Sequence, residues 1–531
     1  MSTPPTLFPL ALAVLLAAVP AGPAALAEEA APPPAVGALE NVSDKQARDA
    51  WVLPDLMGGI YARHCAVCHG AQLEGAAQGP SLLAETLAQG DSVAALTRSI
   101  AEGAPDKGMP AWTAALSAED IRGLAIYLSE KREVDTGAAG RGVGEPPQIP
   151  DRPIASELHR FSLRELAGGF EEAYSIAPLP DGRILVAEKM RGLSVVSADG
   201  AVTTRVTGTP RFHSDSVLRG TTYAGSGWAH EVAVHPDYER NGWIYLSYGD
   251  RCQDCNELSR ETGKQVTMLK LVRGRLEGPV WTDQETVWEA PRETYLDGLE
   301  NGAGARIEFD DRGHVYLSVG VFVDYRRVQD LGMPDGKIHR LHDDGRVPAD
   351  NPWIDEPGAL PSTYTLGHRN PQGLAYNWTT GALWESEHGP RGGDEINILR
   401  AGLNYGWPLA SLGVDYDGLP IRYAEKYGIE FDPAALEPTF FDWTPSPGLS
   451  SIVFYRGDSF PRWRDQLLVA TLKKTDLYRV VLDENGVRHT ETLIQGLGRF
   501  RDVEIGPSGE VLVLIEHRAG SLIVRLDPAD S

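Results

Sequence analysis

A turn followed by a short apolar strand recurs along most of this chain and constrains its fold more than any other feature. The turns contain Pro, Gly, Asp or Thr, and the runs after them are β-branched or aromatic, which is typical of strands. Six such units of roughly 60 residues predict an all-β, six-bladed β-propeller over residues 153–531. An irregular pair of β-sandwiches is the alternative, and the even recurrence disfavours it. The units are 180–182 before 184–186, 235–237 before 243–246, 310–313 before 315–317, 379–381 before 382–384, 461–463 before 467–469, and 507–509 before 511–513.

The N-terminal part of the chain has a different pattern, built around Cys65, Cys68 and His69. Two thiols three positions apart, with a histidine directly after the second, are typical of covalent haem c attachment. Each thiol can form a thioether with a haem vinyl group, and His69 then becomes the proximal iron ligand. A zinc half-site or a redox dithiol is the alternative. A zinc site needs a second ligand pair, and no other cysteine occurs before position 252.

The sixth iron ligand is expected to be Met109. Met57 lies just ahead of Cys65 on the same predicted helix, whereas Met109 lies in the downstream loop 108–112. His/Met ligation raises the haem potential and suits electron transfer; an ordinary core methionine is the alternative. The order of haem motif, glycine-rich loop, Met-Pro and amphipathic last helix resembles a class I cytochrome c. This resemblance implies a small all-α domain over residues 44–135.

Three further segments complete the predicted organisation. Residues 1–27 have the apolar run and the Ala-Leu-Ala ending of a cleavable signal peptide, which implies export to a periplasm. Residues 28–43 are rich in Ala and Pro and are predicted to be a flexible leader, and residues 136–152 are a predicted Gly/Pro linker. No later segment is apolar enough to predict a membrane span. The net charge of −25 argues against nucleic acid as a partner.

Cys252 and Cys255 form a second Cys-x-x-Cys pair, here without a following histidine. This pair is therefore not expected to hold a second haem. In an exported protein, a local disulfide that fixes a loop is the expected outcome.

One block of the predicted propeller carries an oxygen-rich turn. Residues 387–397 combine Gly-Pro and Gly-Gly steps with carboxylates, and residues 404–408 follow closely. Exposed carbonyls and carboxylates suit Ca²⁺, while a solvated acidic turn is the alternative. Together with segments 366–373, 472–474 and 499–502, this block resembles the PQQ-dependent soluble aldose sugar dehydrogenases over about 370 residues.

The resemblance implies a cofactor site made largely of basic residues. PQQ is a planar tricarboxylate, and guanidinium groups bind carboxylates bidentately. The carbonyls of Gly389 and Pro390 match the ligands of the Ca²⁺ that bridges protein and PQQ in this family, while Glu395 and Tyr405 match ligands of a further, structural Ca²⁺. The residues that match the PQQ contacts are Arg369, Asn370, Ser446, Lys473, Arg499 and Arg501.

Two positions depart from the family pattern. Ser226 replaces a glutamine, and Gly302 occupies the position of the general-base histidine. Glycine cannot accept a proton, so another group would have to act as the base. The candidates are His230, Glu300 and Asp297. The alternatives are a satisfied core histidine for His230 and a solvated turn for the two acids.

These observations predict a periplasmic quinohaemoprotein. It would oxidise the C1 hydroxyl of an aldose sugar or similar alcohol with PQQ and pass the electrons to its own haem c. An external periplasmic acceptor would then take them. A propeller that binds PQQ and Ca²⁺ without efficient turnover is one alternative, supported by Gly302. A Ca²⁺-dependent lactone hydrolase is another, which the basic residue set and the fused haem domain disfavour.

Overall fold

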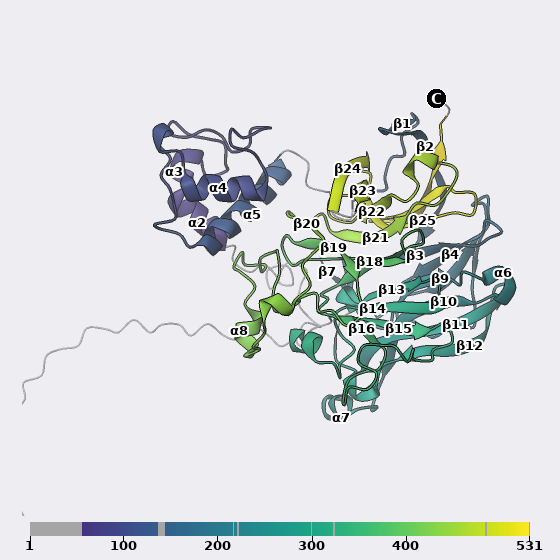
Figure 1. Cartoon of the computed structure of the whole chain (residues 1–531). Helices are drawn as coiled ribbons and strands as arrows, with labels where there is room; N and C mark the ends of the chain where they lie inside the picture. The colour runs from purple at the N-terminus through teal and green to yellow at the C-terminus, as the bar shows by residue number, and fades with distance from the viewer. Residues whose placement is uncertain are drawn as a thin grey trace, which may run out of the picture. The chain divides into compact units, whose positions relative to one another are not determined.

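The computed structural model describes residues 56–135, 144–215, 217–219, 222–298, 300–321, 324–483 and 486–529. The predicted signal peptide and leader, the first part of the predicted cytochrome domain and residues 136–143 of the predicted linker lie outside the described residues. Helices make up the N-terminal part and β-sheets the rest (Figure 1). Among the described helices, none is long and apolar enough to span a membrane.

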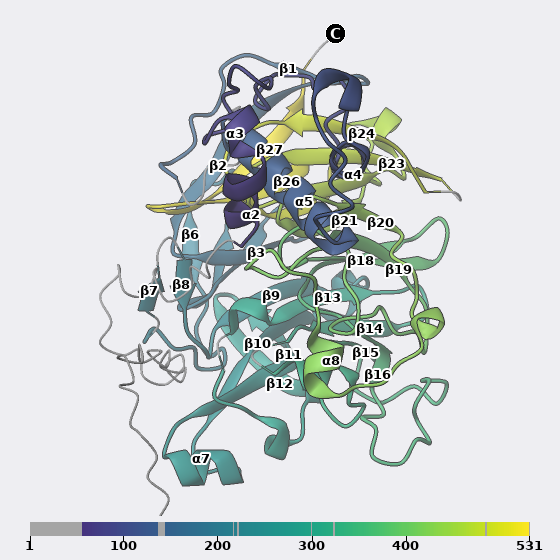
Figure 2. The same ribbon diagram turned by 90° about the vertical axis from the view of Figure 1, so that its left-hand side faces the viewer.

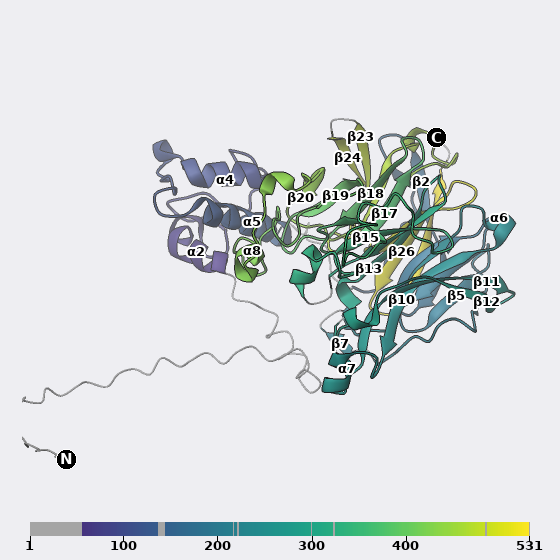
Figure 3. The same cartoon turned by 60° about the horizontal axis from the view of Figure 1, so that its bottom comes forward.

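The N-terminal part is a small helical domain (Figure 3). Ser117 caps its last helix, because the Ser117 hydroxyl accepts a hydrogen bond of 3.0 Å from the Asp120 amide, as the sequence predicts. The predicted apolar face of that helix is buried, with Ile121, Leu124 and Leu128 at most 4% exposed. The elements are α2 (Leu56–His64), α3 (Ala66–His69), α4 (Val93–Glu102), η2 (Pro105–Lys107) and α5 (Ala118–Asp135).

The remaining strands form six antiparallel sheets, which are the blades of a propeller. Figure 2 shows two of these sheets: one contains β9 to β12 in sequence order, and the other contains β13 to β16 in sequence order. The first three blades are β3 (Ala173–Pro178), β4 (Ile184–Glu188), β5 (Gly192–Val196) and β6 (Thr203–Arg205); β9 (Ala229–Val234), β10 (Ile244–Cys252), β11 (Val266–Glu277) and β12 (Val280–Glu289); and β13 (Gly304–Phe309), β14 (His314–Val319), β15 (Lys337–His342) and β16 (Thr363–Leu366).

The other three blades complete the ring. They are β17 (Pro371–Asn377), β18 (Ala382–Glu387), β19 (Asp394–Leu399) and β20 (Phe441–Trp443); β21 (Leu449–Phe454), β22 (Leu467–Thr471), β23 (Leu477–Asp483) and β24 (Gly486–Ile494); and β25 (Arg499–Ile505), β26 (Val511–His517), β27 (Gly520–Pro528), β2 (Arg160–Phe170) and β1 (Ile154–Ala155). Outside the blades lie the hairpin β7 (Val217–Arg219) and β8 (Thr222–Ala224), and the short helices α6 (Tyr238–Asn241), α7 (Glu257–Thr262) and α8 (Tyr423–Tyr427).

The predicted repeat corresponds to one position in every blade. The apolar run of each unit is the second strand, and the turn before it joins that strand to the innermost strand. The six second strands are β4, β10, β14, β18, β22 and β26. The prediction of a six-bladed propeller is therefore confirmed, and the sandwich alternative is wrong.

The two ends of the propeller sequence close the ring within one blade. β2, from the start of the domain, pairs antiparallel with β27 from its end. Because β2 pairs with β27, this edge of β27 is not free to pair with another chain. Since each sheet packs between two neighbours, adjacent residues such as Leu185 and Val186 are both fully buried.

The predicted disulfide between Cys252 and Cys255 is present at the end of β10. Asn256 follows directly and caps α7, accepting a hydrogen bond of 2.9 Å from the Ser259 amide. Both cysteines pack at the edge of a hydrophobic cluster that contains Tyr295 and Leu296. The disulfide therefore holds a surface loop against the core.

Candidate cofactor sites

The innermost strands β3, β9, β13, β17, β21 and β25 all run in the same direction along the central channel, because each is the first inner strand of its blade. We call the end at which these strands begin the upper end. Every one of them carries a β-bulge close to this end. A bulge inserts an extra residue and re-aims side chains, and bulges occur frequently beside active sites.

The residues in these bulges form one polar network. The Tyr174 hydroxyl donates to the Gly304 carbonyl and lies 3.5 Å from the Gln372 side-chain oxygen, to which Arg501 donates at 3.1 Å. Arg306 donates to the backbone carbonyls of Gln372 and Arg501 at 2.6 and 3.0 Å. Residues of the bulges in β3, β13, β17 and β25 thus link four blades around the upper channel. A β-bulge has no sequence motif, so the sequence does not predict this network.

A buried carboxylate fixes the two arginines of β25. Glu516 accepts from Arg499 at 3.1 Å and from Arg501 at 2.7 Å, and Lys189 lies 3.9 Å away. Burial alone would raise the pKa of Glu516, but Arg501, Lys189 and Arg499 together hold it well below its usual value. Lys189 also pairs with Glu172 at 3.2 Å, so two carboxylates face three cations and the cluster carries one surplus positive charge, which suits an anionic ligand.

Arg369 and Asn370 lie between β16 and β17, at the same end of the channel. The Glu387 carboxylate accepts from both backbone amides, at 2.6 and 3.3 Å, which fixes this turn. The Arg369 guanidinium donates to the Tyr416 hydroxyl at 2.9 Å and lies 5.3 Å from the Trp407 ring centroid. Asn370 accepts from Gln372 at 2.8 Å and so joins the bulge network.

Ser446 and Lys473 come from two further connections of the upper end. Ser446 precedes β21, and Lys473 follows β22 with 47% of its side chain exposed. All six residues predicted to contact PQQ therefore lie at the upper ends of β17, β21, β22 and β25. The buried Ser446 Oγ and Arg369 Nε have no hydrogen-bond partner within the described chain. Such orphaned polar atoms, beside a cation cluster, fit a polar anionic cofactor.

The residues predicted to bind Ca²⁺ lie around the turn between β18 and β19. Glu387 and Glu395 face each other across these two strands. A cavity of about 10 Å³ lies among Glu387, Gly389, Glu395 and Tyr405, which is room for one ion or water. Burial and the neighbouring Glu387 raise the pKa of Glu395 to about 8. Two buried carboxylates beside an ion-sized cavity fit a hard cation.

The three candidate bases are not equivalent in the structure. Asp297 is about half exposed and forms an ion pair of 3.0 Å with Lys264. His230 and Glu300 are 1% and 2% exposed, and their side chains are joined by a hydrogen bond of 3.1 Å. Glu300 also accepts from the amides of Gly227 and Trp228 and from the Thr267 hydroxyl. Two candidates from distant parts of the sequence thus form a single pair.

The His230 imidazole uses one ring nitrogen and leaves the other free. Nε2 bonds to Glu300, whereas the buried Nδ1 has no partner among the described residues. The Tyr174 ring meets the imidazole edge-on, with centroids 5.0 Å apart. Through Tyr174 and Gln372, His230 is connected to Arg501 and Asn370.

Gly302 leaves no room for the side chain that occupies this position in the family. A Cβ atom built there would lie 2.7 Å from the Val321 carbonyl oxygen. The backbone therefore closes this position, and a histidine would require the chain to move.

A second cavity, within the helical domain, surrounds the cysteine motif. It measures about 250 Å³ and is lined by Cys65, Cys68, His69 and Met109 together with apolar side chains such as Leu96 and Leu128. His69 Nδ1 lies 2.9 Å from the Pro80 carbonyl, so Nδ1 donates and Nε2 is left to bind a metal. Met57 is fully buried and does not line this cavity. The lining residues fit a haem, whose iron His69 and Met109 would ligate.

A six-bladed propeller with a cation-rich upper channel, joined to a cytochrome c domain, defines a class of two-domain redox protein. Residues 170–524 match the family described as Glucose / Sorbosone dehydrogenase, and residues 54–128 match Cytochrome C oxidase, cbb3-type, subunit III. The chain belongs to the Glucose / Sorbosone dehydrogenase family and carries a cytochrome c domain in addition.

Named relatives agree with this assignment. The chain is 38% identical over 307 residues to aldose sugar dehydrogenase YliI of Escherichia coli. This alignment covers 56% of this chain and 78% of that protein. It is 27% identical over 441 residues to quinoprotein glucose dehydrogenase B of Acinetobacter calcoaceticus, covering 71% of this chain and 89% of the relative. The apo crystal structure of the E. coli soluble aldose sugar dehydrogenase matches with a TM-score of 0.59 at 30% identity, over 70% of this chain and 100% of that one.

Proposed function

We propose that the chain is a PQQ-dependent sugar dehydrogenase that oxidises the C1 hydroxyl of an aldose and passes the electrons to its own haem c. The observation that carries the proposal is the cluster of Arg499, Arg501 and Lys189 around Glu516, at the same end of the channel as Arg369. These cations suit a planar polycarboxylate. PQQ, when bound, would accept two electrons from the sugar.

The arginines of β25 would bind and orient the cofactor. Their Nε atoms donate to Glu516 and their Nη1 atoms donate to the Leu472 carbonyl and the Gln372 side chain, so the Nη2 atoms would meet the carboxylates. The guanidinium of Arg369 would add a further contact, held by Tyr416 and by the Trp407 ring. Because these side chains are already fixed, little conformational entropy would be lost on binding.

His230 would take the proton of the sugar hydroxyl at Nδ1. The hydrogen bond to Glu300 places the ring proton on Nε2 and leaves Nδ1 as an acceptor. Glu300 is a positioning residue, because its four hydrogen bonds occupy both carboxylate oxygens. Histidine is the side chain that most often acts as a general base.

The remaining parts are proposed from the chemistry of their donor sets. The carbonyls of Gly389 and Pro390 would hold Ca²⁺ beside the cofactor, and Glu395 and Tyr405, with Glu387 on the neighbouring strand, would hold a further, structural Ca²⁺. His69 and Met109 would ligate a haem attached through Cys65 and Cys68. The fusion would keep this electron acceptor at high effective concentration. The predicted signal peptide supports a periplasmic location, where a further carrier would reoxidise the haem.

The test uses the full chain with haem attached, supplemented with PQQ and Ca²⁺. A panel of aldoses is added, and haem reduction is followed by absorbance. We expect reduction that requires sugar, PQQ and Ca²⁺ together. Tight PQQ binding without any sugar-dependent reduction would favour the alternative of a cofactor-binding module without turnover.

A further inference from the structure

A large cavity lies at the lower end of the channel, opposite the cofactor residues. It measures about 920 Å³ and is lined by residues from five of the six blades. These residues follow the lower ends of the innermost strands, for example Phe454 at the end of β21 and Ile505 at the end of β25. The volume is within the range of small-molecule sites.

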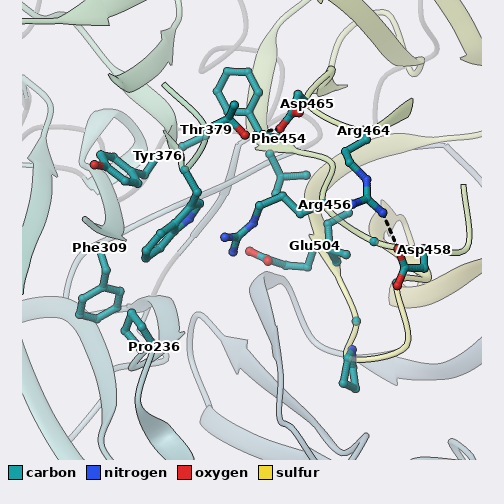
Figure 4. Close-up of a pocket in the computed structure, with 18 of the residues that line it drawn as sticks. Pro236, Phe309, Tyr376, Thr379, Phe454, Arg456, Asp458, Arg464, Asp465 and Glu504 are labelled. Atoms are coloured by element: carbon teal, nitrogen blue, oxygen red, sulfur yellow. Dashed lines mark hydrogen bonds and ion pairs between the residues drawn. The ribbon is translucent and has the colours of Figure 1, made fainter. Parts of the chain in front are cut away.

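Two oppositely charged side chains project into this cavity from neighbouring blades. Figure 4 shows the Arg456 guanidinium and the Glu504 carboxylate directed into the same space. Within the described chain, neither side chain forms a hydrogen bond or an ion pair with protein. Arg456 lies 4.7 Å from the centroid of the Trp378 ring, and this contact orients it. The Arg456 guanidinium and the Glu504 carboxyl group therefore face the cavity together, and neither has a hydrogen-bonding protein partner within the described chain.

The cavity wall disfavours unpaired negative charge. Burial and the nearby Asp502, Glu231 and Glu308 raise the pKa of Glu504 well above its usual value. Burial also raises the pKa of Glu308, which lies in the same wall, to about 7. Glu308 is therefore partly protonated at neutral pH and can then donate as well as accept hydrogen bonds, and the pKa of Glu504 is shifted in the same direction.

The same groups do not make a metal site. Glu231, Asp502 and Glu504 have ligand atoms within 4.8 Å of one another. However, Glu231 and Asp502 are already paired with Arg306, at 2.5 and 2.9 Å. The second Asp502 oxygen accepts from the Ile176 amide at 2.8 Å. Glu504 alone remains, and one carboxylate does not hold a divalent cation.

Apolar surface completes the cavity. Phe309, Tyr376 and Phe454 line it together with Trp378. At its rim, Asp458 pairs with Arg464, and Asp458 is 93% exposed, so the cavity opens to solvent. A ligand that enters would meet aromatic side chains as well as the charged pair.

We propose that this lower cavity binds a small polyhydroxylated compound, a monosaccharide or disaccharide, separately from the substrate site. Each hydroxyl both donates and accepts hydrogen bonds, so one ring can satisfy Arg456, Glu504 and Glu308 together. The C–H surface of the sugar ring packs against the aromatic lining. The site lies at the opposite end of the channel from the cofactor residues, so occupancy does not block them.

The test applies D-glucose and maltose to the full chain without added PQQ, so that no turnover occurs. Hydrogen exchange measured by mass spectrometry reports protection of residues 453–458 and 504–509, and saturation-transfer NMR gives the affinity. We expect protection of both segments in the parent protein. Arg456→Met removes charged donors and should weaken binding about ten- to hundredfold. Glu504→Gln keeps one acceptor and gains an NH2 donor, so it should weaken binding less than Arg456→Met.

Surface substitutions of the same chemistry serve as controls. Arg488→Met and Glu239→Gln alter exposed residues of β24 and α6 and should leave sugar binding unchanged. Thermal unfolding of each variant verifies the fold. If neither sugar protects the two segments, or if the double variant Arg456→Met/Glu504→Gln is protected like the parent, the proposal is overturned. Dehydrogenase activity, assayed on the same preparations, is a separate result and does not decide this one.

Discussion

The His230 imidazole and the Glu300 carboxylate are joined by a hydrogen bond of 3.1 Å between Nε2 and Oε2, deep in the upper channel. In the sequence, these residues are 70 positions apart and are alternative candidates for the general base. The structure makes them one unit, in which Glu300 holds the ring and Nδ1 is left without a partner. This relationship is the basis of our proposal that His230 acts as the base in place of the histidine that Gly302 replaces.

Replacing His230 by Gln should slow the reduction of bound PQQ by sugar about 10²–10⁴-fold, the usual contribution of a general base. Glu300→Gln should slow it less and shift its pH profile, because the amide leaves the imidazole present but poorly oriented. The measurement is rapid mixing of sugar with the PQQ-loaded protein across a pH series. PQQ affinity serves as the control. An unchanged rate in His230→Gln, with intact binding, would remove His230 from the mechanism.

Gly302→His should fail to improve turnover and should destabilise the protein. The new Cβ would lie 2.7 Å from the Val321 carbonyl, so the backbone must shift. Even Gly302→Ala should cost about 1–3 kcal/mol, typical of overpacking. Thermal unfolding of both variants tests this, with Gly313→Ala as a comparison in open space, although its positive φ adds some strain of its own. A stable, faster Gly302→His variant would contradict the closed position.

Arg499→Ala and Arg501→Ala should each weaken PQQ binding about ten- to hundredfold, as expected for lost charge-assisted hydrogen bonds. Glu516→Gln should weaken it less, because it releases the arginines without removing them. Equilibrium titration of PQQ, followed by fluorescence, provides the numbers. Arg525→Gln, on outer strand β27, is the matched control, and haem content should be constant throughout. Unaltered affinity in the double arginine variant would refute the cofactor site.

Met109→Ala should lower the haem potential and abolish the weak methionine-to-iron absorption band. Met109 lines the cavity of the cysteine motif, whereas the buried Met57 does not. A redox titration of the haem and a near-infrared spectrum measure both effects. Met57→Leu should preserve the band. If the band disappears in Met57→Leu and persists in Met109→Ala, the ligand assignment is reversed.

The sequence predicts the architecture well, because the features it depends on are local. The turn before each second strand contains turn-forming residues, such as Asp310 and Gly313 before β14. The haem motif is a contiguous segment, Cys65 to His69. These signals predict the blade count and the helical domain. The extra residue of each bulge has no such signal: Gln372 and Arg501 look like ordinary strand residues until the register is known.

The site itself is predicted in parts. The cations of the cofactor cluster lie where segments 366–373 and 499–502 suggest, but Glu516 and Lys189, which balance them, come from strands without a motif. The His230–Glu300 contact depends on how two blades meet, and that long-range geometry is not encoded in the spacing. Charged residues within otherwise apolar strand segments, such as Arg306 and Asp502, are the sequence signal that indicates this network.

The most direct test of the central claim is a single stopped-flow experiment. The full chain, loaded with haem, PQQ and Ca²⁺ and kept anaerobic, is mixed with an aldose while PQQ and haem absorbance are recorded together. PQQ should be reduced first and the haem afterwards, at a rate independent of protein concentration, because the transfer is intramolecular. Haem that stays oxidised while PQQ is reduced, or a haem rate proportional to protein concentration, would contradict electron transfer within one chain.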